Sequence, residues 1–177
     1  LKPSNPYSAT KAAADMLITA WGRTHKTPYM ILRPTNNYGI GQYVEKLIPK
    51  TVKLANLGRR IPLHNQGKPY RNWLHADDTA EAVITLIEKG KIGEIYNVAG
   101  GFEQSNFDTV RSVFDCMGID ISHNFHHHID FTYSRPGQDV RYSLDDDKLR
   151  SLGWSPKMLF NKEIKRIVAY YKDKFIW

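Results

Sequence analysis

Tyr7 and Lys11 are the residues of this chain whose types and spacing best suit acid–base chemistry. Four positions apart on a helix, their side chains lie on one face. An ammonium group beside a phenol favours the phenolate, and such a phenol can take the proton of a hydroxyl group whose carbon loses a hydride. The spacing therefore predicts a tyrosine base that is assisted by a lysine.

The same spacing occurs again at Tyr170 and Lys174, so the surrounding sequence has to separate the two pairs. Asn5-Pro6 precedes the first pair and is typical of a helix start, with a capping side chain followed by proline at the first helical position. The second pair lies in an amphipathic helix among ordinary solvated charges. This context favours the first pair as the catalytic one.

The elements that must position the first pair indicate an α/β fold, because helical and strand-like periodicities alternate along the chain. The helix that carries the pair should span about residues 7–24. A buried strand at 29–33 follows and is halted by Pro34. Asn36 and Asn37 come next, as a loop at the carboxyl end of that strand, where open α/β sheets place ligands.

The rest of the chain is predicted to form further helices and short strands. Helices are expected at about 45–57, 78–88, 107–117 and 162–175, with a short one ending at 152; strands are expected at 61–64, 70–75, 95–99 and 141–144. A looser, histidine-rich stretch follows residue 117. Cys116 lies in an apolar helical pattern and is expected in the core. As the only cysteine it forms no intrachain disulfide, which fits a reducing compartment.

Composition excludes two broad classes of partner. The net charge is +7, but the Lys and Arg residues are scattered and form no dense basic tract among aromatics, so nucleic-acid binding is not expected. No apolar run approaches the roughly 20 residues of a membrane helix. With 41% hydrophobic residues, the chain is expected to be a cytoplasmic globular protein.

A metal site is a weaker alternative. His123 and the run His126-His127-His128 could ligate an ion. Adjacent residues of a strand point to opposite faces, however, and no cysteines accompany these histidines. No metal is therefore expected.

Several segments together resemble one enzyme family. Residues 6–11, Pro-Tyr-Ser-Ala-Thr-Lys, resemble the Tyr-x-x-x-Lys helix start of the extended short-chain dehydrogenase/reductase family. Residues 36–39, Asn-Asn-Tyr-Gly, followed by 45–49, Glu-Lys-Leu-Ile-Pro, resemble its nucleoside-diphosphate-glucose 4,6-dehydratases, above all the dTDP-glucose enzymes. Further matches at 71–78, 96–101, 135–137 and 152–154 extend the resemblance over nearly the whole chain.

The resemblance implies a carboxyl-terminal portion of a larger enzyme. Residues 1–40 would be the last helix and strand of a Rossmann-type, doubly wound NAD-binding sheet, and residues 41–177 a smaller α/β nucleotide-sugar-binding domain. The glycine-rich loop and the acidic pair that dehydrates the sugar would lie before Leu1. The apolar face of helix 7–24 should then be exposed or covered by another chain. The full-length enzyme is expected to be a homodimer.

The resemblance also assigns roles. Tyr7 would be the base for oxidation at the sugar C4, Lys11 would bind the nicotinamide ribose of NAD and tune Tyr7, and Asn37 would be a further cofactor contact. The residues that would contact the nucleotide-sugar substrate are Asn36, Lys46, Leu47, Pro62, Leu63, His64, Arg71, Asn106 and Arg135. Of these, Arg71 and Arg135 would clamp the diphosphate with their planar guanidinium groups.

Several of these assignments have a purely structural alternative. Arg71 and Arg135 could be surface residues, and Lys46 could be a solvated helix residue. Asn36 and Asn37 could be turn residues, and Pro62 and Leu63 could be packing residues. The sequence also departs from the family pattern. His64 stands where tyrosine is usual, and Ser134 and Gln138 replace the usual Asp and His around Arg-Pro-Gly. The first departure leaves stacking on a base plausible but makes recognition of thymine uncertain.

The expected function is NAD-dependent dehydration of a nucleoside-diphosphate-glucose, with dTDP-glucose as the first choice, to the 4-keto-6-deoxy sugar used for deoxysugar and rhamnose synthesis. A UDP-glucose 4,6-dehydratase would differ only in the base pocket. A UDP-sugar 4-epimerase or UDP-glucuronate decarboxylase shares the Tyr-Lys chemistry, but a loop other than Asn-Asn-Tyr-Gly would be expected there. A non-catalytic nucleotide-sugar-binding fragment is an alternative of a different class.

Overall fold

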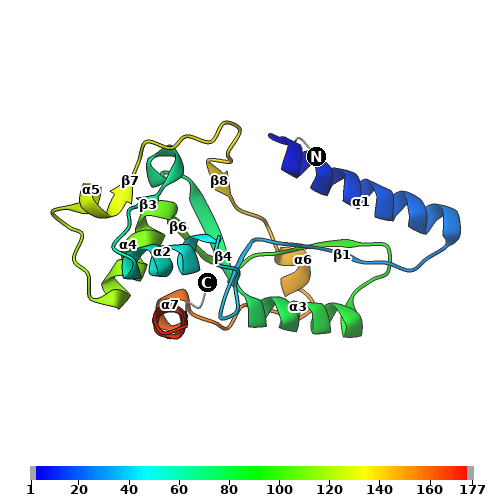
Figure 1. Ribbon diagram of the computed structural model, residues 1–177. Helices are drawn as coiled ribbons and strands as arrows, with labels where there is room; N and C mark the ends of the chain where they lie inside the picture. The colour runs from blue at the N-terminus through cyan, green and yellow to red at the C-terminus, as the bar shows by residue number, and fades with distance from the viewer. Residues whose placement is uncertain (1–2, 175–177) are drawn as a thin grey trace.

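The computed structural model describes residues 3–174, in which helices alternate with short, mostly parallel strands (Figure 1). The helices are α1 (Pro6–His25), α2 (Leu47–Asn56), α3 (Ala76–Lys89), α4 (Asn106–Met117), α5 (Phe125–His128), α6 (Asp147–Arg150) and α7 (Phe160–Lys172), with a 3-10 turn, η1, at His64–Gly67. The strands are β1 (Ile31–Pro34), β2 (Asn36–Tyr38), β3 (Ile61–Pro62), β4 (Tyr70–His75), β5 (Ile95–Val98), β6 (Phe102–Ser105), β7 (Ile129–Asp130) and β8 (Arg141–Tyr142). The α/β fold class predicted from the sequence is confirmed.

Strand β4 is the centre of the larger sheet. Its first two residues pair with β8 and its last three with β2, both in parallel, so β8 and β2 share one edge of β4. Strand β6 runs antiparallel along the other edge. This sheet gathers segments that are far apart in the sequence, since Arg71 faces Tyr142 and Asn36 faces Trp73.

A second, two-stranded parallel sheet of β1 and β5 lies between α1 on one side and α3 on the other (Figure 1). The two sheets meet at the side chain of Asn72 on β4. Its Oδ1 accepts hydrogen bonds from the Thr35 hydroxyl, between β1 and β2, and from the Gly100 amide, between β5 and β6. Gly100 has to be glycine, because a Cβ there would lie 1.7 Å from the carbonyl oxygen of Trp73.

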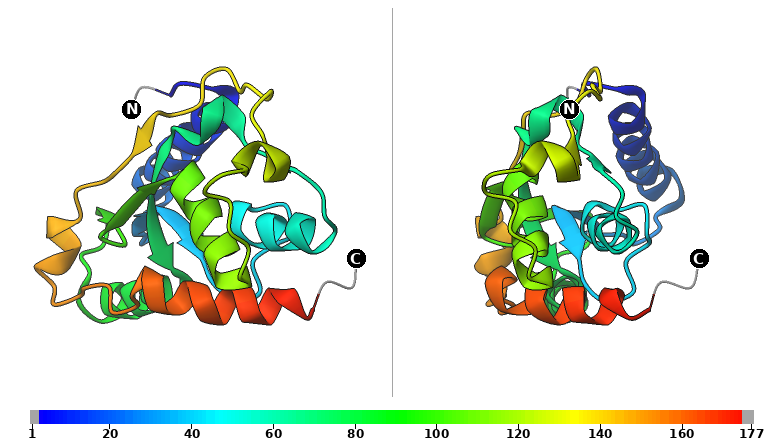
Figure 2. Two further views of the ribbon diagram at one scale, coloured as in Figure 1. Left: turned by 90° about the vertical axis from the view of Figure 1, so that its left-hand side faces the viewer. Right: turned by 60° about the vertical axis from the view of Figure 1, so that its left-hand side comes forward.

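Three clusters of buried side chains make up the core. The first joins β2 and β4 to α2, α4 and α7, and Figure 2 shows α7 running along the base of this layer. The second lies between α3 and the β1–β5 pair, and the third surrounds β3, β7 and α4. Cys116 is half-buried against the first cluster rather than fully buried, and burial raises the pKa of its thiol.

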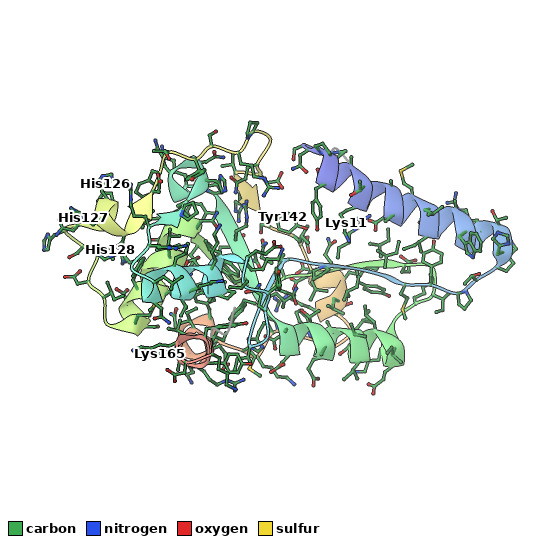
Figure 3. All side chains as sticks on the ribbon, viewed as in Figure 1. Lys11, His126, His127, His128, Tyr142 and Lys165 are labelled. Carbon is green, nitrogen blue, oxygen red and sulfur yellow. The ribbon has the colours of Figure 1, made fainter. Side chains whose placement is uncertain are left out.

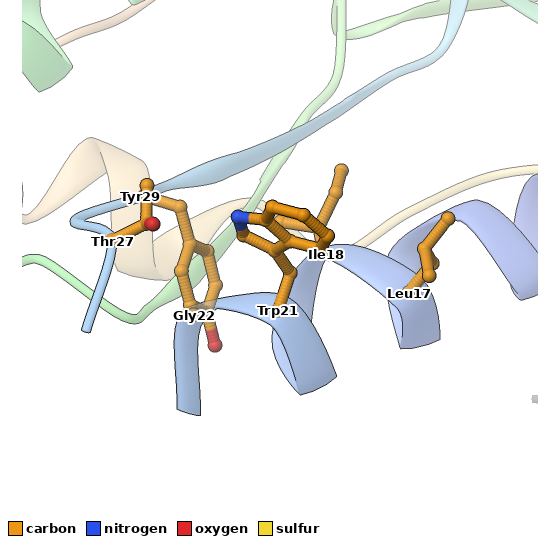
Figure 4. Close-up of a pocket in the computed structure, with 6 residues that line it drawn as sticks. All are labelled: Leu17, Ile18, Trp21, Gly22, Thr27 and Tyr29. Atoms are coloured by element: carbon orange, nitrogen blue, oxygen red, sulfur yellow. The ribbon is translucent and has the colours of Figure 1, made fainter. Parts of the chain in front are cut away.

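Helix α1 contributes nothing to these clusters, as none of its residues is buried. Leu17 is 67% exposed and Trp21 is 56% exposed, which agrees with the expectation that the apolar face of this helix lies open. A hollow of about 340 Å³ opens beside it, lined by Leu17, Ile18, Trp21, Gly22, Thr27 and Tyr29 (Figure 4). The ion pair of Arg33 on β1 with Asp15, at 2.6 Å, ties the helix to the sheet.

The predicted elements are correct over the long segments and wrong at several short ones; residue 175, the predicted end of the last helix, lies outside the described residues. The expected loop at 36–39 begins as strand β2, strand β6 was not predicted, and the histidine-rich stretch contains α5 and β7. The strand expected at 61–64 ends at Pro62. These strands have two to four residues, too few to show a period, and their partners come from distant parts of the chain.

Candidate active site

Tyr7 and Lys11 lie in the first two turns of α1, which is capped as the sequence predicts. Asn5 Oδ1 accepts the Ser8 amide hydrogen at 2.9 Å, and Ser8 Oγ accepts that of Asn5 at 3.1 Å. This reciprocal pair satisfies two amide groups at the helix start. Tyr7 is 68% exposed and Lys11 is also exposed, so both side chains are open to a ligand.

The segment of residues 133–139, here called the Arg135 loop, connects the start of α1 to the larger sheet. At one end, the Arg135 amide donates to Asn65 Oδ1 at 3.0 Å. At the other end, the Gly137 carbonyl accepts from Asn5 Nδ2 at 3.0 Å. Strand β8 follows this loop, and in Figure 3 Tyr142 on β8 and Lys11 on α1 lie on the facing sides of these two elements. The loop thus bridges η1 and the predicted catalytic helix.

Arg71 and Arg135 come together at this loop. Arg71 Nη1 donates to the carbonyl oxygens of Tyr70, at 2.7 Å, and Asp139, at 3.0 Å, which fixes the guanidinium against the loop. Burial lowers the pKa of Arg71, and the positive charge of Arg135 adds to this shift, whereas Asp139 opposes it. Arginine side chains on two segments that meet at one loop suit a doubly charged anion such as a diphosphate.

His64 begins the turn next to Arg135. Its ring meets that of Tyr133 edge to face, with centroids 5.8 Å apart, and its Nδ1 is buried without a hydrogen-bond partner among the described residues. Pro62 is half-buried on β3. Leu63 is buried in the third core cluster, so its side chain packs inside the protein, and only its backbone remains for a nucleotide contact.

Asn36 and Asn37 lie on β2, beside the carboxyl half of β4. Asn36 Oδ1 is buried and has no hydrogen-bond partner within residues 3–174. Both ends of the Asn37 amide are bonded within the chain, because Oδ1 accepts from Thr79 Oγ1 at 2.6 Å and Nδ2 donates to the Thr35 carbonyl. The Asn37 side chain is therefore held against Thr35 and α3, and the residue lines a hollow of about 240 Å³ together with the loop that follows β2.

Three predicted substrate contacts lie at helix starts. Lys46 is exposed and pairs with Glu45 at 2.9 Å in front of α2, whereas Leu47 is half-buried between the first and third core clusters. Asn106 is the first residue of α4 and is almost fully buried. Its backbone N–H donates to the Pro69 carbonyl, just before β4. Asn106 is thereby held close to the strand that carries Arg71.

The sequence did not single out Asn65, which holds the Arg135 loop through three side-chain hydrogen bonds and one from its backbone N–H to the Tyr133 carbonyl. Its backbone is left-handed, with φ of 50°, which asparagine tolerates better than most residues. The run Asn65-Gln66-Gly67 before a proline was a visible signal for such a turn. One of the bonds goes to Gln138 Oε1, at a position where the sequence departs from the family pattern.

The alternative sites lack comparable geometry. Lys174 Nζ lies over the Tyr170 ring at 4.7 Å, at the end of α7, so the second pair is a local cation–π contact. His126, His127 and His128 lie on α5, far from α1 (Figure 3). In the described part of the chain no three His, Cys, Asp or Glu side chains are grouped to hold a metal ion. Among residues 3–174, none of the helices has the length and apolar character that crossing a bilayer requires.

Known proteins resemble this chain in sequence and in structure. It is 38% identical over 178 residues to the dTDP-glucose 4,6-dehydratase of Shigella flexneri, which covers 99% of this chain and 49% of that protein. It is 39% identical over 177 residues to a trifunctional UDP-glucose 4,6-dehydratase/epimerase/reductase of Arabidopsis thaliana, covering 100% of this chain and 26% of that protein. The dTDP-glucose 4,6-dehydratase of Bacillus anthracis, solved in complex with NAD, superposes with a TM-score of 0.89 at 34% identity, covering 100% of this chain and 55% of that one.

The chain thus spans about half the length of the bacterial dehydratases that it matches, or less. The family model described as GDP-mannose 4,6 dehydratase matches residues 1–167. That match includes α1 with its Tyr-Lys pair, the larger sheet and the Arg135 loop. On this match over nearly its whole length, the chain belongs to the GDP-mannose 4,6 dehydratase family of nucleotide-sugar dehydratases and epimerases.

Proposed function

We propose that this chain is the nucleotide-sugar-binding part, together with the catalytic helix, of an NAD-dependent nucleoside-diphosphate-glucose 4,6-dehydratase. Residues 1–40 would belong to the NAD-binding unit and residues 41–177 to the nucleotide-sugar-binding unit, in a homodimeric full-length enzyme. The observation that carries the proposal is the Arg135 loop. It brings the Arg71 guanidinium, the backbone of Arg135 and, through Asn65, the neighbouring His64 into one arrangement with the start of the helix that bears Tyr7 and Lys11.

The binding roles follow from this arrangement. Arg71 and Arg135 would hold the diphosphate, whose two negative charges suit their guanidinium groups. His64, backed by the Tyr133 ring, would lie against the base, and Pro62 and the Leu63 backbone would border it. Lys46, Leu47 and Asn106, at the starts of α2 and α4, would surround the nucleotide end.

In catalysis, Tyr7 Oη would take the proton of the sugar C4 hydroxyl. Lys11 Nζ would stabilise the phenolate and bind the ribose next to it. NAD, when bound next to Lys11, would supply reversible hydride transfer with the sugar, which leaves no net redox change over the reaction. The groups that remove water across C5 and C6 would come from the part of the protein outside this chain.

The residues present fit these ligands. Tyr7 and Lys11 are exposed on one helix, and Asn36 has a buried oxygen without a hydrogen-bond partner in the described chain. Buried polar atoms of this kind normally have a partner, so a ligand hydroxyl or amide is a natural one for Asn36. Asn37 would contact the cofactor only at the edge of its amide, because Thr79 and Thr35 already engage it.

The substrate that we propose first is dTDP-glucose. UDP-glucose is the second candidate, and it rests on two observations: His64 stands where the dTDP-glucose enzymes usually have tyrosine, and the Arabidopsis relative, named for UDP-glucose, is as similar as the bacterial ones. Turnover of dTDP-glucose against UDP-glucose by the full-length protein separates the two.

Replacement of Tyr7 by phenylalanine in the full-length protein tests the mechanism. We expect turnover to fall at least about 100-fold, because the base is lost, whereas the affinity for dTDP or UDP should change less than about twofold. Calorimetric titration measures the affinity, and product analysis separates loss of water from inversion at C4. Near-normal turnover by Tyr7→Phe would exclude Tyr7 as the base. Failure of both nucleotides to bind the wild-type protein would remove the pocket assignment.

A further inference from the structure

Both the oxygen and the nitrogen of the Asn5 side-chain amide form hydrogen bonds. Its Oδ1 accepts the Ser8 amide hydrogen at 2.9 Å and so caps α1. Its Nδ2 donates to the Gly137 carbonyl at 3.0 Å and, more weakly, to Ser4 Oγ at 3.4 Å. Aspartate has no hydrogen-bond donor, and serine and threonine have theirs on the same oxygen that caps the helix. A carboxamide has its donor on a separate nitrogen, which can reach a second partner while the oxygen caps the helix. Capping by itself would not require asparagine here.

Two independent contacts bind the same segments together. Ser4 Oγ donates to Asp139 Oδ1 at 2.9 Å. Gly137 has φ of 69°, and a Cβ built on it would lie 2.9 Å from the Ser4 carbonyl oxygen. The backbone of the Arg135 loop therefore approaches the chain in front of α1 as closely as glycine permits.

The opposite end of the Arg135 loop is fixed beside the proposed base pocket. Asn65, next to His64, accepts from the Arg135 amide at 3.0 Å and donates to Gln138 Oε1 at 3.1 Å. Asn65 therefore holds the loop on both sides of Gly137, the residue that is bonded to Asn5, and Arg135 lies at the first of these attachments. A ligand that binds the Arg135 side chain therefore acts on the Arg135 loop, and Gly137 of this loop is bonded to Asn5, the N-cap of α1.

We propose that Asn5 is a positioning residue that transmits occupancy of the nucleotide pocket to the first turn of α1. When a nucleoside diphosphate orders the Arg135 loop, the amide of Asn5 holds the start of α1, and with it Tyr7, in its place beside the sugar. Coupling of this kind is reciprocal. If a bound nucleotide stabilises the start of α1 by a certain factor, the contact between Asn5 and the Arg135 loop raises the affinity for the nucleotide by the same factor. This inference rests on the proposed function, because it needs a nucleotide at Arg135.

Hydrogen–deuterium exchange of the full-length protein, with and without dTDP or UDP, tests the proposal. In the wild-type protein we expect either nucleotide to slow exchange of the amides at residues 8–11 by about three- to tenfold, the range that corresponds to the net free energy of one hydrogen bond. Asn5→Asp and Asn5→Ser both keep a capping oxygen but lack the amide donor. In these variants the protection by nucleotide should vanish, and the dissociation constant of the nucleotide should rise by a similar factor.

The outcomes separate the two claims. If neither nucleotide binds the wild-type protein, the proposed function fails and this inference fails with it. If a nucleotide binds but leaves exchange at residues 8–11 unchanged, or protects the Asn5 variants as well as the wild type, only the role of Asn5 is overturned. Should the Asn5 variants not fold, Gly137→Ala probes the same contact from the loop side, because its Cβ presses on the Ser4 carbonyl. Undiminished protection in that variant likewise overturns the proposal.

Discussion

Replacing Asn72 with alanine should destabilise the protein by about 2–3 kcal/mol, and the magnitude follows from the two hydrogen bonds that its Oδ1 accepts. The donors are the Thr35 hydroxyl at 3.0 Å and the Gly100 amide at 2.7 Å, and Asn72 is 5% exposed. Each bond contributes about 1 kcal/mol net, and leaving the partly buried Gly100 amide without an acceptor adds roughly another 1 kcal/mol. The variant removes the hydrogen bonds by which Asn72 joins the two sheets.

Urea denaturation measures this loss, provided that the slope of the unfolding free energy with urea stays constant. Thr35→Val is the matched control, because it removes one donor and leaves Asn72 bonded to Gly100. It should cost about 1 kcal/mol or less, and in the Asn72→Ala background it should cost almost nothing. An Asn72→Ala variant that is destabilised by less than about 0.5 kcal/mol, or by no more than Thr35→Val, would show that this side chain does not join the sheets.

Two further predictions concern stability. Gly100→Ala should lower the free energy of unfolding by at least about 3 kcal/mol, because its Cβ would overlap the backbone of β4. Gly58 has φ of 60° but open space around it, so Gly58→Ala should lower it by only about 1 kcal/mol in the same denaturation assay. Hydrogen bonding from Ser143 lowers the pKa of Glu103 below its usual 4.5, Arg141 adds to the shift, and partial burial opposes it. Glu103 therefore stabilises the folded protein above about pH 4.5, and this contribution is lost as the pH falls through the lowered value. The melting temperature of Glu103→Gln should accordingly fall less steeply below that pH than that of the wild type, and identical acid profiles would contradict this role.

The sequence predicts the long elements well because each carries its own signal. The cap at Asn5-Pro6 and the apolar periodicity of residues 7–24 lead to α1 within one residue at either end. The apolar run 29–33 leads to β1, although the ladder itself begins at Ile31. The resemblance to one family was also readable, since the matching segments are spread along nearly the whole chain.

What the sequence did not reveal is the arrangement of the short segments around β4. Strands β2 and β8 share one edge of β4, but they lie about 35 and 70 residues away in the chain on either side, and no local pattern relates them. The same holds for the bond from Asn5 to Gly137, which joins residues 132 positions apart. The sequence shows that Asn65 is a residue type that tolerates a left-handed backbone. It does not show that this residue adopts that conformation or that it binds the Arg135 loop.

Among the proposed site residues, the least predictable feature was which of them also serve the fold. Leu63 and Leu47 pack into the core, and both ends of the Asn37 amide are engaged by neighbours. A side chain in such a position has its orientation fixed before any ligand arrives. Hydrophobic periodicity distinguishes buried from exposed faces. It does not show whether the backbone of a buried residue also borders a ligand.

The place of α7 in the chain has a consequence for synthesis. Half of the first core cluster comes from this helix: Phe160, Ile164, Ile167, Val168 and Tyr171. On the ribosome, β2, α2 and β4 are therefore complete about 90 residues before the side chains that cover them have been made. At roughly 5–20 residues per second, Ile48, Val52 and Trp73 stay uncovered for seconds. The nascent chain in that interval exposes apolar surface of the kind that promotes aggregation, and a chain that ended before residue 160 would expose this surface permanently.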